Sequence, residues 1–398
     1  MDFPFSGADK VIDRLLAHGY AAYVVGGAVR DFLIGRPVHD VDIATSAHPE
    51  EVTRLFKRTV PIGIAHGTVA VLEDGNSYEV TTFRSESSYE DFRHPNHVSF
   101  ERSLDKDLMR RDFTINALAM DRSGCLIDHF GGAADLKAKR IRMVGKPQAR
   151  IREDPLRMLR GLRFAAELGF EIGEGEQIAF IDSAPLLKKL SMERVDQEMT
   201  KLLAGKQAAH AIHMLFETGC ARQLPFLDVP IKRPVLHLHF LNDNDERWSA
   251  FLECISLSLP QTAAFARAWK WPNARRKRVQ LYRSALALCR VQDWNRLSVY
   301  TFSAAVAASA ERLRAALGES TTDALKAIIE TINRIDGRLP IHSSKELAVS
   351  GRDVLQWVGR PAGRWLAGEL AAVEQAVITG QLENEKEAIA AWFQKRSV

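Results

Sequence analysis

The densest group of side chains capable of chemistry lies in residues 150–164, where five arginines and two carboxylates occur within fifteen positions. Glu153 and Asp154 precede Pro155, a pattern that predicts a helix start with acids in its first turn, and the helix should run to about Gly169. Its apolar residues recur at three- and four-residue steps and should face a core. Its charged residues step three at a time and form a slanting stripe of four side chains: Asp154, Arg157, Arg160 and Arg163.

Within this stripe, Asp154 and Arg157 are neighbours at i and i+3, so together they offer an anionic acceptor and a forked donor. Cytosine and adenine present the complementary edge, an exocyclic amine beside a ring acceptor, whereas uracil and guanine present a carbonyl and a ring N–H. A site built on such hydrogen bonds can reject the wrong base by roughly 10⁴-fold. The pair therefore predicts recognition of amino-bearing bases. The alternative is an ordinary ion pair on a solvated helix face.

A second candidate site is the carboxylate pair Asp40 and Asp42 in residues 39–44, which are predicted to form a strand with both acids on one face. The two positions are about 6.6 Å apart along such a strand, so the carboxylates repel each other unless a cation lies between them. Mg²⁺ is usually held by one or two carboxylates and substrate phosphates. Glu79, on a later strand, is a candidate third carboxylate, or else a solvated strand residue. The alternative for the pair itself is a solvent-facing sheet edge.

Gly26 and Gly27 follow an apolar strand over 20–25 and precede a helix over 28–34. Glycines at such a turn let the backbone approach a ligand, and the helix start beyond them offers free N–H groups to a phosphate. Arg30 adds a potential phosphate contact. A simple turn is the alternative for the glycine pair taken alone, but its position shortly before the two aspartates favours a nucleotide site.

Composition excludes several classes of protein. The 398 residues are enough for two to four domains, and 54 Lys+Arg against 50 Asp+Glu leave a net charge of only +4, so any nucleic-acid surface must come from local clustering. The four cysteines are isolated, which argues against zinc and disulfide frameworks and fits a reducing cytoplasm. The longest uncharged run and the amino terminus resemble neither a membrane span nor a signal peptide, so no membrane association is expected.

The front of the chain is predicted to mix helices and strands. Helices are expected over 8–18 and 49–57, a hairpin over 66–72 and 78–83, and a long polar loop over 85–98. Arg110 and Arg111 precede an apolar pattern with helical spacing, and either arginine is a candidate triphosphate contact, with a surface pair as the alternative.

The rear half, from about residue 174, is predicted to be all-α, with amphipathic helices separated by short breaks. Its one dense basic cluster, residues 275–278, lies among Trp269, Trp271 and Tyr282. Basic side chains interleaved with aromatic rings suit contact with an RNA backbone and its bases. A solvated helix end is the alternative.

Several motifs occur together in one order and spacing: Gly26-Gly27-x-x-Arg30-Asp31, Asp40-x-Asp42, residues 110–117 (RRDFTINA) and Glu153-Asp154-x-x-Arg157. As a set they resemble those of the class II tRNA nucleotidyltransferases, the bacterial CCA-adding enzymes. The match covers roughly the first 170 residues. The resemblance implies an α+β fold: a polymerase-β-type nucleotidyltransferase head over 1–140, then a base-recognising helical neck over 141–205, a helical body over 206–300 and a tRNA-binding tail over 301–398.

The resemblance also implies roles for individual residues. Asp40 and Asp42 would hold two Mg²⁺ ions, with Glu79 as a further catalytic candidate beside them. The nucleotide, ATP or CTP, would be held by a larger set: Gly27, Arg30 and Arg111 at the triphosphate, Asp154 and Arg157 at the base, and Arg160 and Arg163 in support. The reaction would then be two-metal nucleotidyl transfer to the 3′ end of tRNA, with the protein rather than a template choosing the nucleotide.

Four other activities remain as alternatives. Relatives that add only CC have a shortened loop after the catalytic strands, whereas residues 85–98 are intact here. Poly(A) polymerases carry a basic segment after the aspartates, where this chain has residues 61–67 (PIGIAHG). An A-adding specialist has similar motifs and is harder to separate. A non-catalytic tRNA-binding protein would have a broken carboxylate pair. The chain is expected to be a monomer or a homodimer.

Overall fold

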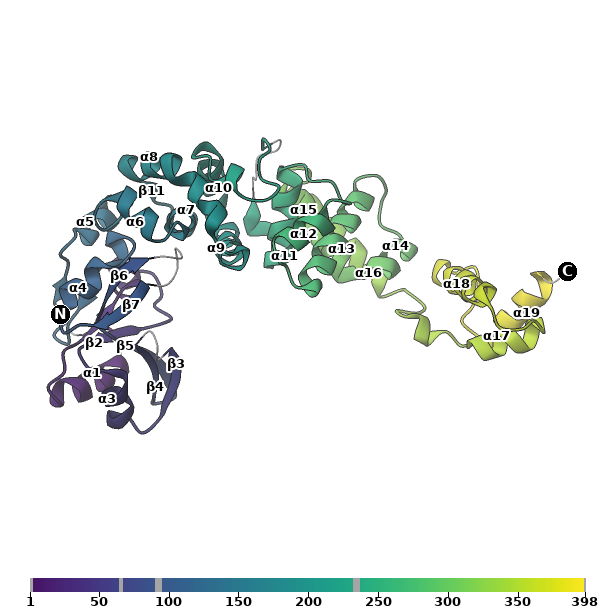
Figure 1. Ribbon diagram of the computed structural model, residues 1–398. Helices are drawn as coiled ribbons and strands as arrows, with labels where there is room; N and C mark the ends of the chain where they lie inside the picture. Colours follow the sequence, from purple (N-terminus) through teal and green to yellow (C-terminus); the bar gives the residue numbers. More distant parts are fainter. Residues whose placement is uncertain (1–2, 64–66, 90–94, 232–236, 397–398) are drawn as a thin grey trace. The chain divides into compact units, whose positions relative to one another are not determined.

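The computed structural model describes residues 3–63, 67–89, 95–231 and 237–396. It divides into two compact units, residues 1–229 and 230–398 (Figure 1). The first unit combines sheet and helix, and the described part of the second is helical, which confirms the predicted α+β class with an all-α rear half. The finer division into head, neck, body and tail stays a prediction.

The first unit is built on a mixed seven-stranded sheet of order β3-β4-β5-β2-β1-β8-β9. Strand β2 pairs antiparallel with β1 and parallel with β5, so the ends of these strands bring residues from distant parts of the chain together. Helices α1 and α3 pack on one face of the sheet (Figure 1). The bounds of the strands are β1 Ala22–Val25, β2 Asp42–Thr45, β3 Thr59–Gly63, β4 Thr68–Glu73, β5 Asn76–Thr82, β8 Ala119–Met120 and β9 Leu126–Ile127.

Three predictions about the front of the chain are wrong. The strand expected over 39–44 begins only at Asp42, because backbone pairing with β1 starts there. The expected loop over 85–98 is largely a hairpin of β6 (Arg84–Tyr89) and β7 (Pro95–Phe100), whose connecting residues 90–94 lie outside the described residues. This hairpin is a sheet separate from the seven-stranded one. Its sequence therefore lacks the alternation of apolar and polar residues by which a core strand is recognised.

The third wrong prediction is a helix after Arg110 and Arg111. These arginines instead follow α4 (Leu104–Met109), and the apolar segment beyond them contains only a short 3₁₀ turn, η2 (Thr114–Asn116). The apolar side chains of this segment are all buried, although the segment is not a helix. Their helix-like spacing in the sequence therefore did not mark one face of a helix. Outside these segments, the helices over 8–18 and 49–57 and the hairpin over 66–83 are confirmed.

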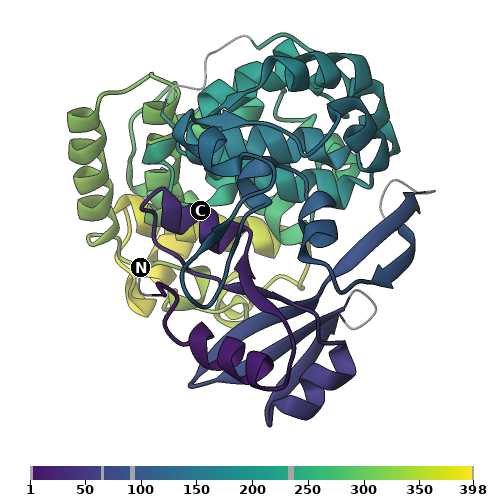
Figure 2. The ribbon, with the colours of Figure 1, turned by 90° about the vertical axis from the view of Figure 1, so that its left-hand side faces the viewer.

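The helices of residues 147–217 gather at one end of the first unit, and the sheet lies at the other (Figures 1 and 2). The charged stretch forms two helices rather than one: Glu153 ends the first, Asp154 lies between them in an extended conformation, and the second runs to Gly169, whose φ of 70° closes it. Pro155 enforces the break because it supplies no backbone N–H. The predicted apolar face of the second helix is buried as expected. The helices of this unit are α1 Ala8–Ala17, α2 Gly27–Leu33, α3 Pro49–Leu55, α4 Leu104–Met109, α5 Gly132–Lys137, α6 Pro147–Glu153, α7 Leu156–Leu168, α8 Glu174–Ser183, α9 Met192–Ala204 and α10 Ala208–Glu217.

We expect a Gly132→Ala substitution to destabilise the first unit, because Gly132 opens α5 directly against the η2 turn. A Cβ atom there would lie 2.2 Å from the backbone oxygen of Thr114. Relieving such a contact requires a backbone shift, which we expect to cost about 2–4 kcal/mol and to lower the midpoint of thermal unfolding by several degrees. Gly175→Ala in α8 is the control, since a Cβ there meets nothing within 4 Å. Equal midpoints for the two variants would contradict this account.

The described part of the second unit is formed by α-helices and short 3₁₀ turns around a core of aromatic rings. Trp248 packs edge-to-face on Phe251, Phe265, Trp269 and Trp271 with ring centroids 5.1–5.9 Å apart. None of the helices among the described residues has the length and apolarity needed to cross a membrane. The helices of this unit are α11 Asn244–Cys254, α12 Thr262–Ala268, α13 Asn273–Cys289, α14 Arg296–Phe302, α15 Ala304–Ala316, α16 Thr322–Asp336, α17 Gly351–Val358, α18 Arg364–Thr379 and α19 Lys386–Arg396.

This core corrects the interpretation of the basic cluster at residues 275–278. The three neighbouring aromatic side chains are at most 9% exposed, so they are not available for stacking on RNA bases. Arg275 and Arg278 both pair with Asp245, at 3.2 and 2.5 Å. The aromatic residues therefore belong to the core, whereas contact of the exposed Lys277 and Arg278 with an RNA backbone stays a prediction.

Candidate active site

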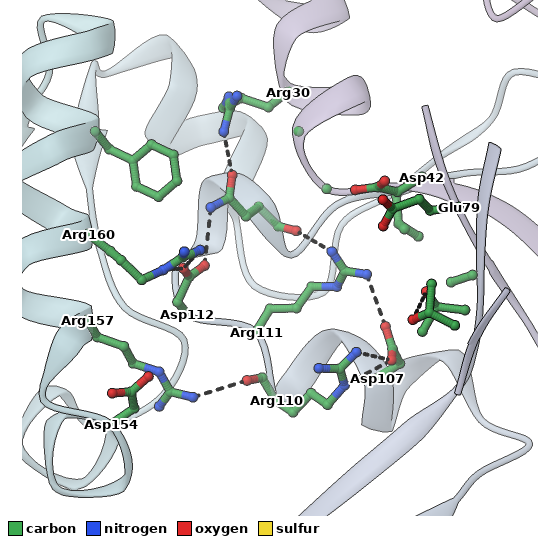
Figure 3. Close-up of a pocket in the computed structure, with 18 of the residues that line it drawn as sticks. Arg30, Asp42, Glu79, Asp107, Arg110, Arg111, Asp112, Asp154, Arg157 and Arg160 are labelled. Atoms are coloured by element: carbon green, nitrogen blue, oxygen red, sulfur yellow. Dashed lines mark hydrogen bonds and ion pairs between the residues drawn. The ribbon is translucent and has the colours of Figure 1, made fainter. Parts of the chain in front are cut away.

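A polar cleft of about 780 Å³ lies within the first unit, between the sheet and helix α7 (Figure 3). Its walls come from the ends of β1, β2 and β5, the starts of α2 and α7, and the segment that links α4 to η2. The cleft brings together every nucleotide-binding residue predicted from the sequence, together with two of the three predicted carboxylates: Gly27, Arg30, Asp42, Glu79, Arg111, Asp154, Arg157, Arg160 and Arg163.

The carboxylates of this cleft come from paired strands. Asp42 and Glu79 are direct register partners on the parallel strands β2 and β5, and both face the cleft (Figure 3). Asp40 lies two residues before β2 and is exposed; it is not among the cleft-lining residues, although its charge acts on Asp42. Loss of solvent and the neighbouring Glu79 carboxylate raise the pKa of Asp42, an effect that the Arg111 guanidinium opposes and Asp40 reinforces. The group is thus short of positive charge.

Carboxylates with little compensating positive charge suit a metal site, because a bound cation would offset their negative charge. Within the described residues, no hydrogen bond or ion pair joins Asp40, Asp42 or Glu79 to a basic side chain, and no three ligating side chains already converge as a complete metal site. Two or three uncompensated carboxylates that leave coordination positions open are suited to a hard divalent cation whose other ligands come from substrate phosphates. The donor set therefore fits a hard divalent cation, which Asp42 could hold with Glu79 beside it in the cleft and Asp40 two residues earlier in the chain.

We expect an Asp42→Asn variant to be more resistant to thermal unfolding than the natural protein in the absence of divalent cations. The raised pKa means that the ionised carboxylate costs stability, and this cost is present above the pKa and disappears as the pH falls through it. The variant should gain a few degrees at pH 8 and lose its advantage towards about pH 4. Addition of Mg²⁺ should raise the unfolding midpoint of the natural protein more than that of the variant. Equal responses of both proteins to Mg²⁺ would contradict a metal role.

The side of the cleft predicted to bind the triphosphate is formed by the glycine turn and three arginines, Arg30, Arg110 and Arg111. Gly26 has a φ of 71°, and a Cβ atom there would lie 2.8 Å from Nη1 of Arg111, so only glycine allows this arginine to approach the start of α2. Arg110 and Arg111 both donate to the buried carboxylate of Asp107, at 2.8 and 3.1 Å. Burial opposes ionisation of Asp107, but the two guanidinium groups hold its pKa below its usual value. Asp107 therefore holds the guanidinium groups of Arg110 and Arg111 in place at the cleft wall.

The side of the cleft predicted to recognise the base contains Asp154 and Arg157, which both line the cleft and already have hydrogen-bond partners within the protein. Oδ1 of Asp154 accepts from the backbone N–H of Leu156 at 3.0 Å, and Oδ2 accepts from Arg194 at 2.7 Å. Arg157 donates to Glu153 at 2.7 Å and to the backbone oxygen of Arg150 at 2.9 Å. The pair is therefore pre-oriented, although Asp154 is held by the turn before α7 rather than by the helical stripe expected from the sequence.

Arg160 and Arg163 are placed by carboxylates from other elements. Arg160 donates to Asp112 at 2.7 Å, and Arg163 forms an ion pair with Glu198 of α9 at 3.1 Å. Burial opposes ionisation of Asp112, but Arg160 and a hydrogen bond from Asn116 hold its pKa well below its usual value. The guanidinium carbon of Arg163 lies 4.2 Å from the ring centre of Phe164, and that of Arg30 lies 5.3 Å from the same ring. One aromatic ring thus supports arginines from two elements.

Sequence reasoning missed several residues that shape this cleft, namely Asp107, Asp112, Asn116, Phe164, Arg194 and Glu198. Asp112 and Asn116 belong to the 110–117 motif, so the motif pointed to the segment but not to these side chains. Arg194 and Glu198 sit on an ordinary amphipathic helix, and only its packing against α7 brings them to the site. No local spacing distinguishes them from solvated helix residues.

A nucleotide-sized cleft with opposed carboxylates on a mixed sheet, a glycine turn and converging arginines defines a nucleotidyltransferase. Family models agree: residues 22–142 match the poly A polymerase head domain, residues 169–229 a domain described as a probable RNA and SrmB-binding site of polymerase A, and residues 240–393 the putative domain 2 of tRNA nucleotidyltransferase.

Full-length relatives make the family more specific. The chain is 44% identical over 399 residues to the CCA-adding enzyme of Geobacillus stearothermophilus, covering 99% of this chain and 98% of the relative. The CCA-adding enzyme of Enterococcus faecalis is 40% identical, with 98% and 96% covered. A crystal structure of the Bacillus stearothermophilus CCA-adding enzyme in complex with CTP is similar with a TM-score of 0.93 at 42% identity, covering 100% and 98% of the two chains. The chain belongs to the family of CCA-adding enzymes.

Proposed function

We propose that this protein adds CCA to the 3′ end of tRNA, using CTP and ATP without a nucleic-acid template and releasing pyrophosphate. The observation that carries the proposal is the single cleft that joins the Asp42–Glu79 carboxylates to the Asp154–Arg157 pair through a row of arginines. Full-length relatives that bear the name CCA-adding enzyme support the same activity.

In this proposal each wall of the cleft has one task. The backbone at Gly27 and the side chains of Arg30 and Arg111 bind the triphosphate. Asp154 accepts from the exocyclic amine of cytosine or adenine, and Arg157 donates to the ring acceptor beside it. Arg160 and Arg163 keep the base-reading helix in place through their buried ion pairs. Holding the α-phosphate and the tRNA end in line is the main contribution of the protein.

The divalent cation is proposed to be Mg²⁺, held by Asp40 and Asp42, with Glu79 as a further carboxylate. When bound, such ions lower the pKa of a hydroxyl nucleophile and neutralise charge on leaving phosphates. The four cysteines are free, which is in keeping with work in a reducing cytoplasm. tRNA is the macromolecular partner, and the chain acts as a monomer or a homodimer.

Incubation of the protein with Mg²⁺ and tRNA that lacks its 3′ end tests the proposal, with CTP and ATP supplied separately and together. CCA addition should give two C residues with CTP alone and a third nucleotide, A, when ATP is also present. Addition of C but never A would indicate a CC-adding specialist, and addition of A only to tRNA already ending in CC would indicate an A-adding one. A long A tract would indicate a poly(A) polymerase, and tRNA binding without extension a non-catalytic binder.

A further inference from the structure

Asn116, at the end of η2, hydrogen-bonds directly to Arg30 and Arg111 and is joined to Arg160 through Asp112. Its side-chain oxygen accepts from Nη1 of Arg30 at 2.7 Å, and its side-chain nitrogen donates to Oδ1 of Asp112 at 3.1 Å. Its backbone oxygen accepts from Nη1 of Arg111 at 3.3 Å. Because Asp112 in turn accepts from Arg160, one residue connects the triphosphate side of the cleft to helix α7. Figure 3 shows three of the residues that this network joins, Arg111, Asp112 and Arg160, beside one another in the cleft, with Arg30 facing them.

The chemistry of this link requires an amide. The guanidinium of Arg30 can only donate, and the carboxylate of Asp112 can only accept, so the group between them must accept on one side and donate on the other. The amide of asparagine does both, and its orientation is fixed by these two neighbours. A carboxylate at this position would face Asp112 with like charge, and an aliphatic group would remove one hydrogen bond from each of the two neighbours.

The backbone that carries this amide is anchored. Asn116 is only 8% exposed, and its N–H donates to the backbone oxygen of Phe113 at 3.0 Å. Thr114, in the same turn, donates from its backbone N–H to the backbone oxygen of Arg142 at 2.9 Å and from its hydroxyl to Asp135 at 2.5 Å. Asn116 is therefore held by the core of the unit and can set the position of its partners rather than follow them.

The Asn116 contact is the hydrogen bond that joins the Arg30 guanidinium to an element other than its own helix. Its Nε and Nη2 donate to the adjacent Asp31 at 2.9 and 3.1 Å, and only its Nη1 reaches across to Asn116. A guanidinium has five N–H groups, so the three described bonds leave two for a ligand. Asp31 belongs to α2, the same helix as Arg30. Asn116 belongs to η2, so its bond to Nη1 ties the guanidinium to a separate element.

We propose that Asn116 is a positioning residue, which orients Arg30 and the Asp112–Arg160 pair together so that the triphosphate and the base of one nucleotide are held in a common geometry. This inference rests on the proposed function, since it assigns Asn116 a role in nucleotide use by the same cleft. Asn116 acts through the arginines and need not touch the nucleotide itself.

The first test measures KM and kcat for CTP and for ATP with 3′-shortened tRNA. Asn116→Leu and Asn116→Asp should each lower kcat/KM by about 30-fold for both nucleotides, mainly through KM, while the Kd for tRNA stays within about twofold. The loss should be equal for CTP and ATP because the link lies outside the base-reading pair. Gln292→Glu, at an exposed position after α13, makes the same amide-to-carboxylate change outside the cleft and outside the predicted tRNA-binding tail, and should leave all constants unchanged.

The decisive test exchanges the two partners. In the double variant Asn116→Asp/Asp112→Asn, the carboxylate is at position 116 and the amide at position 112. The carboxylate accepts from Arg30 and from the amide nitrogen, and the amide oxygen accepts from Arg160. Each of these three contacts again joins a donor to an acceptor. The backbone N–H of Phe113 loses its acceptor on residue 112, so recovery should be partial. We expect kcat/KM of the double variant to exceed that of Asn116→Asp by about tenfold.

A double variant no better than the product of the two single losses would overturn the inference, as would a normal KM in Asn116→Leu. Thermal unfolding of each variant separates lost positioning from lost folding. If Asn116→Leu does not fold, the Asp and exchange variants still decide, because they keep the size of the side chain. Inactivity of the natural protein on shortened tRNA would instead mean that the proposed function is wrong, a result distinguishable from activity that the substitutions leave intact.

Discussion

An Asp42→Ala variant should incorporate neither CMP nor AMP into shortened tRNA, with a loss of at least about 10³-fold in kcat. Asp42 is a cleft-lining carboxylate of β2 that lies opposite Glu79 in register, and its burial together with the Glu79 carboxylate raises its pKa. Its removal deletes a proposed ligand of the cations that stabilise charge on the nucleophile and the leaving group, which is the largest single contribution to such a reaction.

The loss should be confined to chemistry. Helix and sheet contacts of Asp42 are made by its backbone, so the fold and the affinity for tRNA should be preserved. Filter binding of tRNA and single-turnover incorporation of each nucleotide measure the two properties separately. Asp182→Ala, an exposed carboxylate on α8, is the matched control and should retain full activity. Retention of more than a tenth of the natural CMP incorporation rate by Asp42→Ala would disprove the catalytic role of this carboxylate.

Much of this cleft could be predicted because its parts are marked by local spacing. Two aspartates at alternate positions, a glycine pair between a strand and a helix, and arginines at three-residue steps each imply a geometry that depends on only a few neighbouring residues. The structure places Asp42, Gly27 and Arg157 in one cleft, as those patterns predicted. Asp40 is the exception, because strand pairing begins two residues later than the alternation suggested.

The residues that could not be predicted are those whose partners are distant in sequence. In the sequence, Asp107 is one acid of a short helix, and only the fold shows that it is buried beside Arg110 and Arg111. Glu198 pairs with Arg163 across 35 positions of sequence (198 − 163). Nothing in their own spacing shows which cation they will meet. The same reason explains why base stacking beside residues 275–278 was wrongly expected, since the three aromatic side chains there pack in the core. Burial is a property of the whole fold, whereas residue type and spacing are local.

The second large effect is expected in base selection. Arg157→Ala should reduce the preference for CTP over UTP by about 100-fold, because a donor that faces N3 and O2 of cytosine would be lost while Asp154 remains to accept from the amine. The position of Arg157 supports this role: its side chain is 7% exposed, lines the cleft, and is oriented by Glu153 and by the backbone oxygen of Arg150. A guanidinium held so firmly can select a partner by geometry rather than by charge alone.

Competition between CTP and UTP at equal concentrations, followed by sequencing of the extended tRNA ends, measures this selectivity directly. Arg152→Ala is the matched control, since Arg152 lies five positions earlier, is exposed and is absent from the cleft wall. Arg157→Ala also leaves Glu153 with one partner fewer, so Arg157→Lys should be measured beside it: lysine restores the charge but not the fork, and should therefore recover stability more than selectivity. If lysine restored selectivity fully, or if alanine left UTP excluded, base choice would have to come from cleft shape rather than from the Asp154–Arg157 pair.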